Sequence, residues 1–110
     1  MGTKPLAEFE LLVMLATART AEAYGAAIRR EIEERTGRDV SIGALYATLS
    51  RLEDKGLLDA EATAPQPVPG GRARKVYRFT PAGLRAVRHA TGIVDRMREG
   101  LDLDMVEVRS

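Results

Sequence analysis

Cationic side chains are concentrated in one part of this 110-residue sequence. Residues 62–94 contain six basic residues and no Asp or Glu, so the segment has a net charge of +6. A basic segment without carboxylates is typical of a surface that binds a polyanion, although chance clustering on a solvated face gives the same composition. The six residues are Arg72, Arg74, Lys75, Arg78, Arg85 and Arg88.

Residues able to perform catalysis or bind metals are sparse. His89 is the one histidine, and nothing at a useful spacing would make it a general base. Asp102 and Asp104 alternate like the start of a calcium-binding loop, but the glycine and the terminal glutamate of such a loop are missing. We therefore expect no enzyme activity, no metal site and no cofactor.

The stretch from residue 40 to 57 has the pattern of one amphipathic helix with a start and a stop. Ser41 is a residue type that caps helix N-termini, and Gly56 can adopt the left-handed conformation that ends a helix. Apolar residues recur between them at steps of three and four, which marks one face of a 3.6-residue period. These residues are Ile42, Leu45, Leu49 and Leu52.

The opposite face of this helix carries small and mostly uncharged side chains. Small side chains let a helix approach another surface closely, and a helix of this thickness fits the major groove of DNA. A core helix with an idle small face is the competing interpretation, and the stretch alone leaves both open. The face consists of Gly43, Ala44, Ala47, Thr48, Ser50 and Arg51.

Two helices are expected before this stretch. The first begins near Thr3-Lys4-Pro5, because Pro is tolerated in a first helical turn. The second covers about residues 23–36 and ends at Gly37. Its charged residues 29–35 largely pair at helical spacing, which favours a solvated face. Two helices joined by about four residues that include a glycine indicate a helix-turn-helix.

A β-hairpin and a fourth helix are expected after it. The period changes from 3.6 to 2, which predicts strands over residues 57–63 and 73–80 around a loop rich in Pro and Gly. Thr80-Pro81 then has the pattern of a helix N-terminus. A helix-turn-helix followed by a basic hairpin predicts a winged helix, so the expected fold is mainly α with a small β-hairpin.

The first and fourth helices carry more apolar surface than a domain of this size can cover. A second subunit is the expected cover, which makes both of them dimerisation helices. The residues assigned to this contact are Leu11, Leu12 and Leu15 in the first helix, and Leu84, Val87, Thr91, Val94 and Met97 in the fourth. We expect residues 1–80 to form the DNA-binding domain and residues 81–110 to form the dimerisation helix and tail. The pattern of residues 101–110 is ambiguous between helix and extended chain.

Composition agrees with a soluble, cytoplasmic protein. The chain is 45% hydrophobic and 30% charged, it lacks Cys, and no apolar run approaches the ~20 residues of a membrane span. We expect no contact with a membrane.

The chain resembles the PadR family of bacterial transcriptional regulators over residues 6 to about 90. Segments in both the helix-turn-helix and the wing match the family in order and spacing. They are residues 24–28 (Y-G-A-A-I), 32–37 (I-E-E-R-T-G), 41–49 (S-I-G-A-L-Y-A-T-L), 51–53 (R-L-E), 55–57 (K-G-L), 70–78 (G-G-R-A-R-K-V-Y-R) and 80–84 (T-P-A-G-L).

The resemblance implies a dimeric winged helix, in most members a repressor, in which the C-terminal helix of one subunit packs on the N-terminal region of the other. It also implies that the helix containing Leu45 and Tyr46 is the recognition helix and that Tyr46 faces the sugar-phosphate backbone. The chain has Glu22-Ala23 where many relatives have His-Gly. Some small relatives stack drugs on a Trp at the dimer interface, and the absence of Trp here argues against that role.

The favoured function is therefore a homodimeric regulator that binds an inverted-repeat operator in double-stranded DNA. The residues expected at base edges are Ser41, Gly43, Ala44, Ala47 and Thr48. The residues expected at phosphates or in the minor groove are Tyr46, Arg51, Arg72, Arg74 and Lys75.

Two other functions remain open from the sequence. A winged helix can serve as a protein-interaction module whose basic wing binds an acidic partner, and such a module should show large apolar residues on the recognition face. The protein can also sense an unidentified small-molecule effector between the first and fourth helices. The candidate lining of that site is Phe9, Val13, Met14, Val87 and His89.

Overall fold

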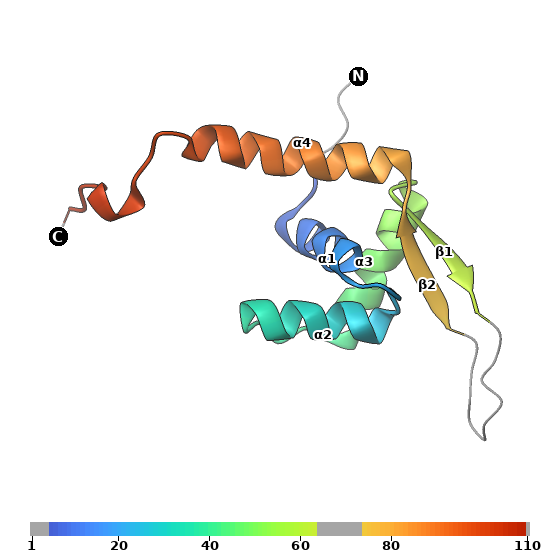
Figure 1. Cartoon of the computed structure of the whole chain (residues 1–110). Helices are drawn as coiled ribbons and strands as arrows, with labels where there is room; N and C mark the ends of the chain where they lie inside the picture. Colours follow the sequence, from blue (N-terminus) through green and yellow to red (C-terminus); the bar gives the residue numbers. More distant parts are fainter. Residues whose placement is uncertain (1–4, 64–73, 110) are drawn as a thin grey trace.

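The computed structural model describes residues 5–63 and 74–109 and confirms the expected fold class. Three helices are followed by a two-stranded antiparallel hairpin, a long fourth helix and a short 3₁₀ turn (Figure 1). The elements are α1 (Glu8–Arg19), α2 (Gly25–Thr36), α3 (Ile42–Asp54), β1 (Leu58–Ala62), β2 (Lys75–Phe79), α4 (Pro81–Arg98) and η1 (Leu103–Met105).

Local signals at three helix ends are confirmed. The Ser41 hydroxyl accepts a hydrogen bond from the Ala44 N–H at 3.1 Å, and the Thr80 hydroxyl accepts one from the Gly83 N–H at 3.0 Å. Gly56 ends α3 in the left-handed region, with φ of +72°. The expected start of the first helix is wrong, because α1 begins at Glu8; Thr3 and Lys4 lie outside the described residues.

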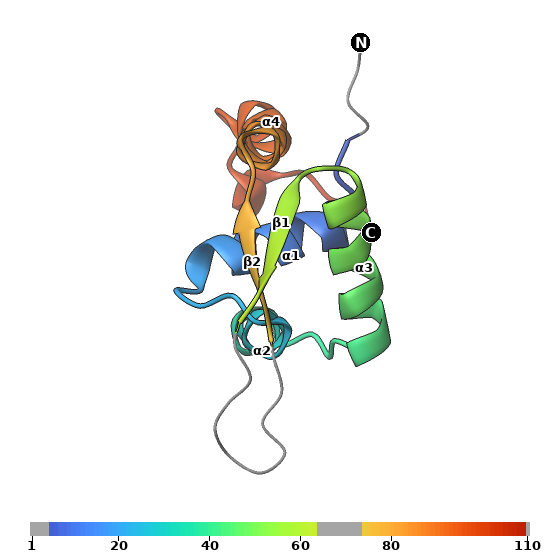
Figure 2. The same ribbon diagram turned by 90° about the vertical axis from the view of Figure 1, so that its right-hand side faces the viewer.

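The core lies between α1, α2, α3 and the hairpin. Its fully buried side chains come mostly from the first three helices, and Leu58 and Tyr77 close it from the two strands. The strands pair from Leu58 opposite Phe79 to Ala62 opposite Lys75. Figure 2 shows α3 along one side of the domain, with α4 and α2 at opposite ends of the view.

The buried face of α3 differs by one residue from the expected stripe. Ile42 is 58% exposed, whereas Thr48 is 2% exposed and shares the buried face with Leu45, Leu49 and Leu52. At 3.6 residues per turn, Thr48 lies at one edge of this face, next to Leu52, while Ile42 lies at the opposite edge, next to Leu49, in the first turn. Hydrophobicity alone does not predict this face, because a threonine whose hydroxyl is hydrogen-bonded can be buried at low cost.

The N-terminal half of α4 belongs to the same core. Thr80 ties it to the end of α3, since its hydroxyl donates to the Gly56 carbonyl at 2.6 Å and its N–H donates to the Leu57 carbonyl at 3.2 Å. Gly83 lies so close to the Leu57 carbonyl that a Cβ would overlap it. The C-terminal half of α4 projects beyond the domain (Figure 1). No helix in the described part of the chain is long and apolar enough to cross a membrane.

Candidate nucleic-acid interface

The exposed face of α3 holds most of the residues expected at DNA. Ser41, Gly43, Ala44 and Ala47 are exposed at its N-terminal end. Thr48 is the exception, because its buried side chain faces the core and cannot reach a base edge. Ile42 is exposed on this face instead. Apart from Ile42 and Tyr46, the exposed side chains at this end of the helix are small.

Tyr46 joins α3 to the start of α2. It is half-exposed, and its hydroxyl and ring lie against the backbone of Gly25, so that a Cβ at residue 25 would overlap the phenol. The side chain expected at the sugar-phosphate backbone therefore also fixes how the two helices of the helix-turn-helix approach each other. A Tyr and a Gly twenty-one residues apart give no signal of this contact in the sequence.

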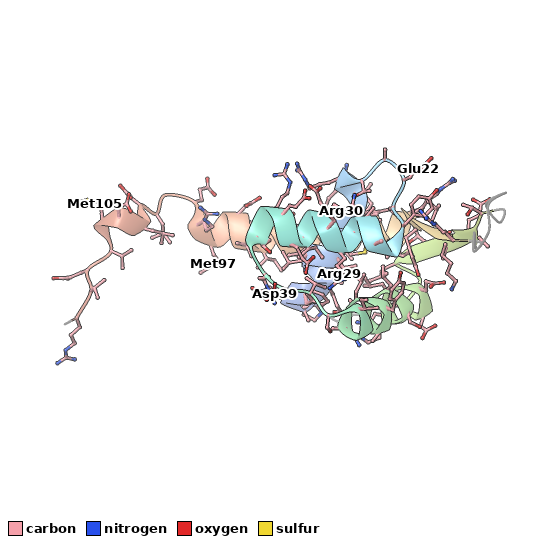
Figure 3. All side chains as sticks on the ribbon, turned by 90° about the horizontal axis from the view of Figure 1, so that it is seen from below. Glu22, Arg29, Arg30, Asp39, Met97 and Met105 are labelled. Atoms are coloured by element: carbon pink, nitrogen blue, oxygen red, sulfur yellow. The ribbon has the colours of Figure 1, made fainter. Side chains whose placement is uncertain are left out.

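Arg29 and Glu33 hold the turn between α2 and α3. The Arg29 Nε donates to the Val40 carbonyl at 2.7 Å, and a carboxylate oxygen of Glu33 accepts from the Val40 N–H at 3.0 Å. Figure 3 shows Arg29 on the side of α2 nearest this turn, which contains Asp39. Arg29 and Glu33 pair at the expected i,i+4 spacing, at 3.8 Å, but both are only partly exposed and also satisfy the backbone of buried Val40 before α3 begins.

A second charge pair on α2 also has the spacing expected from the sequence. Arg35 and Glu31 pair at the i,i+4 spacing, and Glu31 also binds Arg19 at the end of α1 at 2.9 Å. The hydrogen bonds from Arg19 and Arg35 lower the pKa of Glu31. This network joins α1 to α2 on a surface away from the exposed face of α3.

The loop end of the two strands presents two of the expected phosphate-binding residues. The Arg74 guanidinium lies 5.1 Å from the centre of the Tyr24 ring, and the Lys75 ammonium lies 3.5 Å from the Glu53 carboxylate. Both contacts are on exposed side chains, where such pairs contribute little and reorient readily. Arg72 lies outside the described residues.

Tyr24 anchors this end of the hairpin to α2. It is the N-cap residue of α2 and forms an isolated bridge with Val76 of β2. Its hydroxyl donates to Glu22 at 3.1 Å, and this hydrogen bond raises the pKa of Tyr24. The phenol thus stays neutral and keeps its π face available to the Arg74 guanidinium.

Arg51 is half-exposed on α3 and is held by two neighbours. Its Nε lies 3.8 Å from Oε2 of Glu10, and its Nη2 donates to the Thr48 hydroxyl at 3.1 Å. Glu10 is a buried carboxylate of α1, and its contacts with Arg51 and Lys55 were not predicted from the sequence. The sequence offers little signal of this burial, because an acidic residue in the first turn of a helix is common on the surface.

The expected dimerisation residues fall into three groups. Leu11, Leu12 and Leu15 are partly buried in α1, and Thr91 is partly buried in α4. Val87 is buried in its own chain, so its assignment to a subunit contact is wrong. The remaining three residues of α4, Leu84, Val94 and Met97, are exposed. Figure 3 shows Met97 and Met105 on the part of the chain that projects past α2.

The candidate effector residues do not line a common opening. Val13 and Met14 have no exposed surface, Val87 is buried, and His89 is exposed. An open pocket of about 620 Å³ lies elsewhere, between the end of α1, the connection to α2 and strand β2. Within the described residues, no group of His, Asp and Glu side chains is arranged to hold a metal ion.

Comparison with known proteins gives one consistent relationship. A model of the transcriptional regulator PadR-like family matches residues 14–89. The chain is 49% identical over 76 residues to Transcriptional regulator Rv3488 of Mycobacterium tuberculosis, and the match covers 69% of this chain and 66% of that protein, slightly less than two thirds of its length.

Solved structures agree with this relationship. A PadR-like transcription factor from Bacteroides fragilis superimposes with a TM-score of 0.71 and 26% identity, covering 83% of this chain and 84% of the other. RosR from H. salinarum superimposes with a TM-score of 0.70 and 27% identity, covering 92% and 84% of the two chains.

Proposed function

Because the chain belongs to the PadR-like family of transcriptional regulators, which bind DNA, we propose that it is a homodimeric repressor that recognises an inverted-repeat operator. The observation that supports this proposal best is the exposed N-terminal half of α3, whose side chains are small enough for the helix to enter a major groove. We infer that the protein acts in the cytoplasm, where bacterial DNA is accessible.

In this proposal α3 supplies sequence readout. Ser41 offers a hydroxyl at the leading end of the helix, and Ile42 offers an apolar surface of the kind that contacts a thymine methyl group. Gly43, Ala44 and Ala47 contribute little hydrogen bonding but allow a close approach. With so few base-reading side chains, the shape and deformability of the operator carry part of the specificity.

Phosphate contacts come from the edges of the same surface. Tyr46 and Arg51 lie on α3, and Arg74 and Lys75 lie at the start of β2, at the loop end of the strands. Arg72 is assigned to the same role from its place in the sequence. These side chains position the protein on the duplex, while the groove contacts specify the site.

The dimer is proposed from the unmatched apolar surface of α4. We propose that residues 1–80 form the DNA-binding part and that residues 81–110 form the dimerisation helix and tail, with the first turns of α4 also packed in the core. Val94 and Met97 are 50% and 74% exposed on the projecting half of the helix. Packing them on α1 of a second subunit would bury both surfaces and place two recognition helices about a two-fold axis, which requires an inverted repeat.

A charge on the exposed face of α3 provides the direct experiment. Ala47→Glu should abolish binding to a duplex selected by the wild-type protein from a random-sequence pool, because the carboxylate would face phosphates. Ala21→Glu adds the same charge to the exposed connection on the other side of the hairpin (Figure 2) and should bind normally. Equal binding by both variants would exclude α3 as the reading element.

A protein-interaction module is the second candidate, and the exposed Ile42 and Tyr46 favour it, since large apolar residues on α3 are what such a module needs. The same selection separates the two functions. A wild-type protein that enriches no sequence and loses all binding to DNA at about 0.15 M salt would support the protein-binding role.

A further inference from the structure

Two carboxylates at the start of α1 bind side chains from the segments that precede and follow α3. The Arg38 guanidinium, in the turn before α3, donates to Glu8 at 2.7 Å and lies 5.9 Å from the centre of the Phe9 ring. Lys55, the C-cap residue of α3, donates to Glu10 at 2.7 Å. One turn of α1 therefore contacts the segments that precede and follow the recognition helix.

Glu10 is the stronger of these two connections because it is buried. Its side chain is 6% exposed, and no other charged residue among those described is buried. One oxygen accepts from the Ala7 N–H at 2.9 Å and the other from Lys55. Burial alone would raise the pKa of Glu10, but these hydrogen bonds and the charges of Lys55 and Arg51 outweigh it and lower the pKa, so the group is ionised at neutral pH.

Arg51 extends this contact to the exposed face of α3. Its guanidinium is placed between Glu10 and the Thr48 hydroxyl, and it follows Ala47 by one helical turn. A side chain held at two points loses less conformational entropy when it binds a phosphate. Glu10 therefore acts on both the position of α3 and the direction of its exposed arginine.

We propose that Glu10 is a positioning residue for sequence recognition, which orients α3 and Arg51 through its contacts with Lys55 and Arg51. The proposal rests on the DNA-binding function proposed above. Binding to random DNA depends mainly on charge, whereas binding to an operator also requires α3 to sit correctly in the groove. Loss of the Glu10 charge should therefore reduce discrimination and not overall attraction to DNA.

The test measures Glu10→Gln on two duplexes of equal length and composition. One is the sequence that the wild-type dimer selects from a random pool, and the other is a scrambled version. Affinity for the selected duplex should fall about tenfold, a size typical of residues that share an ion-pair network. Affinity for the scrambled duplex should stay equal or rise slightly, because each subunit gains one unit of positive charge.

A matched control separates positioning from charge and from stability. Glu31→Gln makes the same charge change and removes the exposed pairs to Arg19 and Arg35. It should leave the ratio of the two affinities within about twofold of wild type. Circular dichroism and sedimentation at the assay temperature establish that each variant is a folded dimer.

A second variant keeps the proposal testable if Glu10→Gln does not fold. Lys55→Gln removes the 2.7 Å contact from a partly exposed side chain and should lower discrimination in the same direction by a smaller factor. The double variant should lose no more than Glu10→Gln alone, because both changes break one contact. Unchanged discrimination in Lys55→Gln, or fully additive losses, would overturn the proposal.

The outcomes also distinguish this inference from the proposed function. A wild-type protein that selects no sequence contradicts the DNA-binding function itself. A wild-type protein that selects a sequence, together with a folded Glu10→Gln dimer that discriminates as well, contradicts only the positioning role of Glu10.

Discussion

The phenol of Tyr46 lies directly against Gly25, so α3 meets the start of α2 at a point where a Cβ at residue 25 would overlap the ring. Gly25 does not have a positive φ, so its backbone alone would accept alanine. The close contact with Tyr46 is therefore what favours glycine at residue 25. Tyr46 is half-exposed, which leaves it room to rotate outward if the contact is crowded.

Gly25→Ala should therefore destabilise the protein in spite of the better helix propensity of alanine. Crowding of this kind costs ~1–3 kcal/mol, against a gain of up to ~1 kcal/mol from propensity. Tyr46→Ala in the same background should recover part of the loss, because it removes the clashing ring. Gly43→Ala is the control, since nothing lies within 4 Å of its Cβ position, and it should be neutral or stabilising. Thermal unfolding of the four proteins measures these effects, and a stabilised Gly25→Ala would refute the contact.

The contribution of Arg74 to DNA binding should appear in the salt dependence. If Arg74 leaves the Tyr24 ring to bind a phosphate, Arg74→Ala should weaken binding to all sequences similarly. The slope of log affinity against log salt should flatten by ~2 for the dimer, about one unit per subunit. Arg19→Ala removes an equal charge from the side of the domain away from α3 and should leave the slope unchanged. A shift in sequence preference at constant slope would mean that Arg74 reads bases.

Signals confined to a few neighbouring residues predicted the fold well. The caps at Ser41 and Thr80, the stop at Gly56 and the change of period before β1 each depend on local conformation, and all four are confirmed. The hairpin could be predicted from the two strands, because strands separated by a segment rich in Pro and Gly have few other partners in a chain this short.

Contacts that depend on how the helices pack could not be predicted from the sequence. Thr48 was assigned to the DNA face because its hydroxyl can read a base, but the packing of α3 on α1 turns it inward, where Arg51 satisfies it. Glu10 and Lys55 are 45 residues apart, and nothing local relates them. Arg29 and Glu33 fit an exposed i,i+4 pair, and only the three-dimensional turn shows that they bind Val40.

Stability should depend on the ionisation of Glu10. Because its pKa is lowered on folding from the ordinary value of 4.5, the unfolded chain binds the proton more tightly. The stabilisation is therefore fully present above about pH 4.5 and is lost as the pH falls through the folded pKa. The difference in unfolding free energy between wild type and Glu10→Gln should be larger at pH 7 than at pH 3. Denaturant titrations at the two pH values measure it, and a difference independent of pH would mean that the carboxylate is not stabilised by its partners.

The last prediction concerns Val94, whose exposure lets assembly be separated from folding. Half of its side-chain surface is exposed in the single chain, on the projecting part of α4, so an Asp there disturbs no packed core. In a dimer that buries this surface, the same Asp would be an unpaired charge out of water, which is far more costly than the loss of ~1.5–3 kcal/mol of apolar burial per valine. Two-fold symmetry places the substitution in the interface twice.

Val94→Asp should therefore be monomeric at micromolar concentration with an unchanged helical circular dichroism spectrum. Operator affinity should fall steeply, because the second half-site is then bound by a separate molecule. Val108→Asp makes the same substitution at a valine that is more exposed and lies beyond the helix, and it should remain dimeric. Sedimentation velocity and a binding titration on the two variants decide the matter. A dimeric Val94→Asp protein with full operator affinity would place the subunit contact on another surface.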